Sequence, residues 1–231
     1  MKKLGIALAS ALLIFANGLQ AQELPFSFGI KGGFLNPSMT GLDKAKGPWN
    51  TESVSQIFNP SLQGGLFAEY AFHDYVGAGF EALYIGAGSR LHEKGKEKND
   101  LKINIQQISL IPLLKLYPMG REVDEGIFSI HLGPEMALLP LTSKYKKGSE
   151  QAQDFNDDDL NAFRVDALGG LGYEFPFGLS LEGRFSYGFM DVFKKDSKFK
   201  KGTLQIKDDA NTNPWYGTFS VGYNFARLLE E

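Results

Sequence analysis

Two short segments carry charged residues at alternate positions. Arg164 is separated from Asp166 by one residue, as Glu182 is from Arg184. Alternate residues of an extended chain project to the same side, so each pair shares one face of a strand. Four such charges could bind a charged ligand or gate a pore. They could also neutralise each other in a closed interior, where an unpaired charge is costly, and we favour this structural arrangement.

A histidine offers a second kind of chemistry. His131 could act as a general base near Glu135, which shares its strand face. No recognisable motif places a serine nucleophile beside it, so we favour a histidine that is hydrogen-bonded within the interior. Both residues belong to a larger set with the same alternation. We expect this set to form a structural network of paired charges: Lys31, Glu69, Glu81, Lys115, His131, Glu135, Arg164, Asp166, Glu174, Glu182 and Arg184.

An acidic run could in principle hold a divalent cation. It consists of Asp154, Asp157, Asp158 and Asp159, and hard cations prefer clustered carboxylates. The spacing matches no EF-hand pattern, so we favour a solvated loop. The chain has no cysteine, which excludes thiolate nucleophiles and thiolate metal sites. We expect no metal and no cofactor.

Eight segments position these residues, and all of them alternate with a period of two. Apolar residues hold one parity, while small or charged residues hold the other, which is typical of β-strands. No segment of comparable length has a helical stripe of apolar residues. The segments are residues 26–34, 62–72, 76–84, 108–116, 128–136, 163–175, 179–189 and 215–225.

Short and long connections alternate between the eight segments. The short ones cover residues 73–74, 118–126 and 176–178, and the long ones cover 37–60, 89–100, 140–161 and 190–213. Strict alternation puts the tight turns at one end and the loops at the other. The sequence therefore predicts an all-β fold, an eight-stranded antiparallel up-and-down barrel with four long outer loops and three short periplasmic turns.

The composition of the two faces favours a transmembrane barrel over a soluble lipocalin-like binding barrel. Eight strands leave an interior just wide enough for side chains, which suits the glycines, serines and charged residues of the polar face. The 30 aromatic residues (19 Phe, 9 Tyr and 2 Trp) concentrate near the ends of the apolar faces. Aromatic belts around an aliphatic band are typical of membrane barrels.

Residues 1–21 have the features of a secretory signal peptide. Lys2 and Lys3 precede an apolar run from Leu4 to Ala16, and a small residue, Ala21, ends the segment. We expect residues 22–231 to be the exported outer-membrane barrel domain. The net charge of −3 provides no basic surplus for nucleic acid.

The fourth long loop is basic. Lys194, Lys195, Lys198, Lys200 and Lys201 could contact the phosphates of lipopolysaccharide at the outer surface. We favour a solubilising role for this charge.

An outer-membrane enzyme that modifies lipids is the alternative function. It would need serine, histidine and an acid together at the lipid-facing rim, and Ser89, His92 and Glu93 are the loose candidates. They match no catalytic motif, so we predict that the protein is not an enzyme. The glycine-rich residues 169–172 precede no helix and are not a nucleotide-binding loop.

Three short motifs resemble those of the PorT-like outer-membrane β-barrel family of Bacteroidetes. They are Phe28-Gly29-Ile30-Lys31-Gly32-Gly33, residues 108–118 (ISLIPLLKLYP) and Val221-Gly222-Tyr223-Asn224-Phe225. The resemblance implies an outer-membrane barrel with a structural, binding or secretion and assembly role. The implied partners are membrane lipid, lipopolysaccharide, the barrel-assembly machinery and secretion-system proteins. The sequence departs from the family pattern in one respect. The assembly machinery usually reads a final aromatic residue near the terminus, but here residues 226–231 follow the final aromatic residue, Phe225.

Overall fold

A computed structural model of the chain describes residues 25–40, 54–93, 100–121, 125–148, 150–156, 159–194, 196–197, 199 and 211–229. Within these residues the backbone is mostly extended, as the alternation predicts. No helix in this part of the chain is both long and apolar enough to cross a membrane. The expected signal peptide, residues 1–21, lies outside the described residues.

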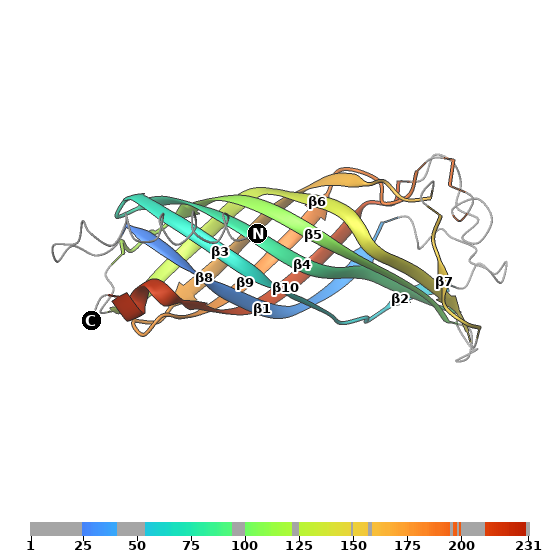
Figure 1. Cartoon of the computed structure of the whole chain (residues 1–231), viewed down its shortest axis with the longest axis horizontal. Coiled ribbons are helices and arrows are strands. Elements are labelled where there is room, and N and C mark those ends of the chain that lie inside the picture. The colour runs from blue at the N-terminus through green and yellow to red at the C-terminus, as the bar shows by residue number, and fades with distance from the viewer. Residues whose placement is uncertain are drawn as a thin grey trace, which may run out of the picture.

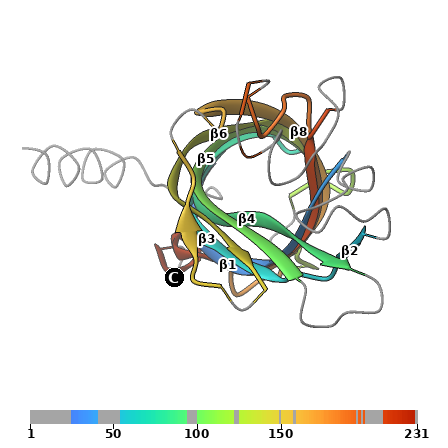
Figure 2. The same ribbon diagram turned by 90° about the vertical axis from the view of Figure 1, so that its right-hand side faces the viewer.

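Eight long strands of the described residues form an antiparallel barrel in which each strand pairs with the next one along the chain. β1 also pairs with β10, from Gly29 opposite Asn224 to Met39 opposite Pro214, and this pairing closes the sheet. Figure 2 shows the closed ring from one end. The predicted eight-stranded up-and-down barrel is confirmed. Its strands are β1 (Phe26–Met39), β3 (Ser61–His73), β4 (Val76–Glu93), β5 (Asp100–Leu116), β6 (Ile127–Lys147), β8 (Phe163–Glu174), β9 (Leu179–Gly188) and β10 (Pro214–Asn224).

The two ends of the barrel differ in their connections. The tight connections between β3 and β4, β5 and β6, and β8 and β9 lie at one end, called the turn end (Figure 1). The 3-10 helix η4 (Phe225–Leu229) follows β10 at the same end. The opposite end is called the loop end. There, two short strands widen the sheet: β2 (Val54–Ile57) pairs with β4, and β7 (Gln153–Asp154) pairs with β6.

Four strands extend further toward the loop end than the sequence predicts. The prediction placed loops at residues 37–60, 89–100 and 140–161. In the structure β1 continues to Met39, β4 to Glu93 and β6 to Lys147, and β5 begins at Asp100. These predicted loop bounds are therefore wrong. The alternation does continue through the extensions, with its polarity reversed.

The reversal is clearest on β5. Between Leu116 and Ile108 the outward side chains are apolar, whereas between Gln106 and Asp100 they are polar or charged. The inward side chains of the second stretch are apolar and fully or almost fully buried: Leu101, Ile103 and Ile105. An apolar outer face suits lipid and a polar one suits water, so the boundary near residue 107 marks the edge of the lipid-facing band.

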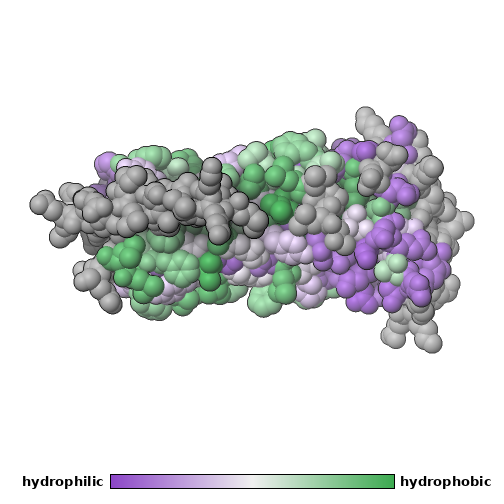
Figure 3. Space-filling model, in the orientation of Figure 1, coloured by the Kyte–Doolittle hydropathy of each residue, from purple (hydrophilic) through white to green (hydrophobic). Residues whose placement is uncertain are grey.

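Most of the remaining outer surface is apolar, while hydrophilic residues gather at the loop end (Figure 3). Outward side chains such as Phe34, Leu62 and Phe72 are each more than 60% exposed. A soluble barrel buries its apolar face inside, so this arrangement rules out the lipocalin-like alternative. Aromatic residues are exposed near strand ends, but Phe80 is exposed between them, so the division into two belts is incomplete.

The interior contains two apolar layers that the sequence did not predict. The first, the inner layer, lies between the strands: Leu35, Leu83, Ile85, Ile111, Leu113, Leu168 and Tyr216. The second, the loop-end core, packs the strand extensions against residues of the long connections: Met39, Leu91, Leu101, Ile103, Ile105, Phe155, Leu160, Val192, Phe193 and Phe199. The barrel is therefore solid at the loop end as well as in its middle.

Candidate functional site in the barrel interior

Four charged side chains from three strands meet in the interior and form what we call the central cluster: Lys31, Glu81, Glu182 and Arg184. The Lys31 Nζ atom lies 2.8 Å from Glu81 and 2.6 Å from Glu182. Arg184 donates two hydrogen bonds of 2.7 Å to Glu81 and lies 2.6 Å from Glu182. Two basic and two acidic groups balance, and all four are at least nine-tenths buried. The geometry is that of a charge-neutral network of buried ion pairs.

Glycine residues provide the space that this network needs. A Cβ atom at Gly170 would lie 2.5 Å from Cγ of Arg184, and one at Gly172 would lie 2.8 Å from the ring of His131. Both glycines are on β8, next to the strands that carry these side chains. The absence of a side chain at alternate positions of β8 thus lets larger polar groups fill the interior.

A second cluster closes the turn end. Lys115 and Tyr117 both bond to the carboxylate of Glu69. Arg227 of η4 donates a 2.9 Å hydrogen bond to Glu174, which also accepts one from Asn224. A cavity of about 20 Å³ lies among these residues, which is room for one water molecule.

Glu135 and His131, which the sequence raised as a catalytic pair, have separate partners. Glu135 accepts hydrogen bonds from Ser109 at 2.7 Å, Ser186 at 3.0 Å and the hydroxyl of Tyr216. The Nε2 atom of His131 lies 2.7 Å from the hydroxyl of Ser129. The two residues are four positions apart on β6, which corresponds to about 13 Å along a strand. The pair is therefore not assembled for general-base chemistry.

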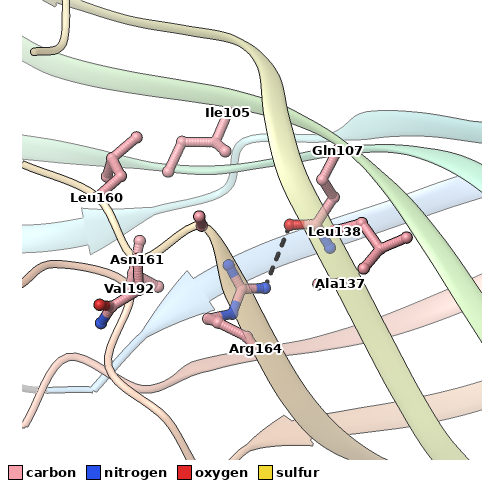
Figure 4. A pocket seen from close by; sticks show the side chains of 9 residues that line it. Ile105, Gln107, Ala137, Leu138, Leu160, Asn161, Arg164 and Val192 are labelled. Carbon is pink, nitrogen blue, oxygen red and sulfur yellow. Dashed lines mark hydrogen bonds between the residues drawn. The ribbon is translucent and has the colours of Figure 1, made fainter. Parts of the chain in front are cut away.

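Arg164 and Asp166 form a further pair nearer to the loop end. Nη2 of Arg164 lies 3.4 Å from Asp166. It also donates a 3.2 Å hydrogen bond to the amide oxygen of Gln107 (Figure 4). The cavity beside them, which Ile105, Leu160 and Val192 also line, measures about 10 Å³. The sequence placed Arg164 and Asp166 with Glu182 and Arg184, but the structure has two separate pairs.

Charged and hydroxyl side chains thus occupy the parts of the described interior that the two apolar layers leave. The structure places all eleven residues of the expected network on the inner side of the barrel, with Glu174 at the turn-end mouth. Several partners were missed, although Tyr117 and Tyr216 continue the inward parity of their strands. The residues missed are Gln107, Ser109, Tyr117, Ser129, Ser186, Tyr216, Asn224 and Arg227.

The acidic run of the third long loop is only partly within the described residues. Asp154 is exposed and lies 3.7 Å from Lys144, whereas Asp159 is buried and accepts hydrogen bonds from Ser197 and the Phe199 amide. Among the described residues, no group of three potential ligands could hold a metal ion. Asp157 and Asp158 lie outside them.

Of the five lysines in the fourth loop, Lys194 is the one within the described residues. Its backbone amide donates a 3.0 Å hydrogen bond to the Asp159 carbonyl, which joins the third and fourth loops. Lys195, Lys198, Lys200 and Lys201 are outside the described residues.

The loose catalytic candidates on β4 do not come together. Ser89 is buried on the inner face and bonds Gln56 at 3.1 Å, while His92 is on the outer face. Glu93 is the last residue of β4, and its side chain is outside the described part. A serine and a histidine on opposite faces of one strand cannot form a catalytic pair.

His92 instead takes part in an ion-pair group on the outer face of the loop end. Its Nδ1 atom lies 2.7 Å from Asp100, and Nε of Arg90 donates a 2.8 Å hydrogen bond to the same carboxylate. Partial burial alone would raise the pKa of Asp100. The hydrogen bonds from His92 and Arg90 outweigh this effect and lower the pKa below its usual value.

Known structures of small outer-membrane barrels are similar to this chain over most of their length. OprG from Pseudomonas aeruginosa is 19% identical, with a TM-score of 0.46 over 90% of this chain and 99% of that one. Ail, the attachment invasion locus protein of Yersinia pestis, is 11% identical, with a TM-score of 0.40 over 87% of this chain and 100% of that one. Neisserial surface protein A is 12% identical, with a TM-score of 0.40 over 86% and 96%. Among curated proteins, none matches the sequence.

A sequence family described as the outer membrane protein beta-barrel domain matches residues 20–194, which is most of the chain. The match agrees with the closed sheet, its apolar outer face and its polar interior. The protein is accordingly located in the outer membrane, and the chain belongs to the outer membrane protein beta-barrel domain family.

Proposed function

We propose that the protein is a plugged, non-enzymatic outer-membrane barrel that acts through its loop-end surface rather than through its interior. The observation that supports this most strongly is the central cluster, in which Arg184 on β9 bonds directly to Glu81 on the opposite wall. The inner layer and the loop-end core lie between this cluster and the loop end. Moving a solute past these layers would require breaking buried ion pairs and then displacing packed apolar side chains.

Liposome swelling provides the test of this proposal. The protein is reconstituted with its fold checked by heat-modifiability on gels, and the liposomes are then transferred to isotonic arabinose, glucose or sucrose. We expect no swelling above that of empty liposomes, whereas a known porin reconstituted in parallel swells. Entry of arabinose at a rate that scales with the amount of protein would refute a plugged barrel.

The loop end has the features of a supported binding platform. β2, β4, β5, β6 and β7 form a continuous wall there, and the loop-end core stabilises its inner side. Such a core supports a surface with a fixed shape, which favours recognition. A structural or binding role at the cell surface is the function that follows, since outer-membrane barrels carry their longer loops on the outside.

The resemblance to PorT-like barrels of Bacteroidetes supports a more specific role beside secretion or assembly partners. Affinity purification of the tagged protein from outer membranes, after mild crosslinking, tests this role. We expect secretion-system proteins to co-purify in stoichiometric amounts. Recovery of the barrel-assembly machinery alone, which handles every such barrel during biogenesis, would leave only the general role.

A further inference from the structure

The outer wall at the loop end carries a row of basic residues in register across three strands. Arg90 on β4 pairs with Lys102 on β5, which in turn pairs with Lys146 on β6. All three side chains are on the outward face. Strands are about 4.8 Å apart, so the three positions span about 10 Å. Lys144 lies two residues from Lys146 on the same face and is exposed, opposite Asn104.

Like charges opposite each other destabilise a sheet, so this row has a cost in the isolated protein. Only part of the charge is neutralised by described residues. Asp100 pairs with Arg90, and Asp154 lies 3.7 Å from Lys144 in an exposed contact of little strength. Lys102 and Lys146 have no acidic partner in the described part of the chain. Among the described residues, the outer face of the row therefore carries more positive than negative charge.

What lies outside the wall follows from the height of the row above the lipid-facing band. Lys102 is six residues beyond Ile108, the last apolar outward residue of β5. At about 3.3 Å per residue and a tilt of about 40°, this places it about 15 Å above the band. Lys144 lies opposite Asn104, about 10 Å above it by the same measure. Long lysine side chains can extend toward the bilayer from these positions.

Among the described residues of β4 and β5, no charged side chain lies on the outer face between the row and the band. Gly86 and Gly88 on β4 have no side chain there, and Asn104 and Gln106 on β5 are neutral hydrogen-bonding groups. The headgroup region of a bilayer extends about 5 to 7 Å beyond its hydrocarbon core, so lysine side chains that reach down from the row approach the headgroup phosphates. A row of cations above a neutral polar band is complementary to phosphate groups on such headgroups.

We infer that Arg90, Lys102, Lys144 and Lys146 form a binding surface for the phosphate groups of lipopolysaccharide, on the wall of the barrel rather than on its loops. This inference rests on the proposed function only in assigning the binding role to the loop end. It does not depend on the interior being closed. Binding would orient the wall in the outer leaflet and fix the height of the loop-end platform.

The test titrates detergent-solubilised protein with mixed micelles that contain fluorescent bis-phosphorylated lipid A. We expect Lys102→Gln/Lys146→Gln to weaken binding by about 25-fold, because each basic residue near an anionic surface contributes about fivefold in affinity. The double Lys→Arg variant should bind as the wild type does. Lys147→Gln is the matched control, since it removes one charge from the adjacent position, on the opposite face of β6.

Three results would overturn the inference. The first is equal binding of dephosphorylated and bis-phosphorylated lipid A to the wild type. The second is equal weakening by Lys146→Gln and Lys147→Gln, which would indicate a general charge effect. The third is full displacement of lipid A by millimolar inorganic phosphate, which would assign the site to free phosphate. None of these results bears on sugar entry in the liposome assay, so the two proposals fail separately.

Discussion

Arg184 on β9 and Glu81 on β4 are joined across the barrel by two hydrogen bonds, both 2.7 Å long. Around the ring, three strands separate β4 from β9 on either side, so the two residues bridge opposite walls. Lys31 on β1 adds bonds to Glu81 and Glu182. The central cluster therefore ties distant strands together and occupies the axis of the barrel.

Replacement of Arg184 by alanine should destabilise the barrel strongly. Among the described residues it leaves Lys31 as the one cation in direct contact with Glu81 and Glu182, and breaking a buried ion pair costs about 3 to 5 kcal/mol. Urea unfolding in phospholipid vesicles, followed by tryptophan fluorescence, gives the free energy of unfolding. Adding Glu81→Gln should restore part of the loss, because it removes the uncompensated carboxylate. An unchanged unfolding midpoint in Arg184→Ala would show that the cluster is not structural.

Phe193→Ala should loosen the loop end while the membrane-spanning part stays folded. Phe193 is completely buried in the loop-end core, and truncating a buried phenylalanine costs about 3 to 5 kcal/mol. Hydrogen exchange should show that residues 101–105 lose protection, whereas residues 110–116 keep theirs. Phe189→Ala is the control, since Phe189 is 66% exposed on the outside. Equal loss of protection in both segments would argue against a separate loop-end core.

The group around Asp100 should weaken in acid. Its folded-state pKa is lowered by His92 and Arg90, so its contribution to stability is complete above the unfolded pKa of about 3.9 and is lost as pH falls through the lower folded value. Amide exchange at the ends of β4 and β5 should accelerate over this range. Asp100→Asn should show the faster exchange already at neutral pH and remove the acid dependence. The same pH profile in both proteins would rule out Asp100 as the titrating group.

The edge of the lipid-facing band can be located with two arginine substitutions on β5. Leu114→Arg places a charge in lipid and should cost about 1 to 3 kcal/mol, depending on its depth. Gln106→Arg is on the same face just beyond the polarity reversal, opposite Thr142 rather than a lysine, and should change the free energy of unfolding by less than about 0.5 kcal/mol. Both are measured by unfolding in vesicles. An equal loss of unfolding free energy in the two variants would show that the edge of the lipid-facing band does not lie between these positions.

The part of the barrel nearer to the turn end could be predicted from the sequence, because one pattern of apolar and polar positions applies throughout it. Apolar residues hold the outward parity of each segment, and this fixed the strands, their number and the inward position of residues such as Lys31 and Glu182. The part nearer to the loop end could not be predicted in the same way. On β5 the pattern reverses near residue 107, so Ile103 and Ile105 face inward although they resemble lipid-facing residues.

The sequence also could not predict which side chains pair with each other within the interior. Parity assigns a residue to a face but does not say which side chains meet across the barrel. Arg164 and Arg184 have the same parity, yet Arg164 bonds to Gln107 and Arg184 to Glu81. The tyrosines are another example, since Tyr216 was not expected to bond Glu135. These contacts depend on the stagger between strands, which the polar pattern of single strands does not determine.

Conductance across a planar lipid bilayer is the most direct test of the plugged barrel. Single-channel recording in 1 M KCl measures whether ions cross the protein, and folded insertion is confirmed by protease protection of the same preparation. The account predicts no stable conductance steps for the wild type, and steps or rapid flicker for Arg184→Ala if that variant folds. Long-lived steps of uniform size from the folded wild type would contradict it, because ions would then be passing the central cluster and both apolar layers.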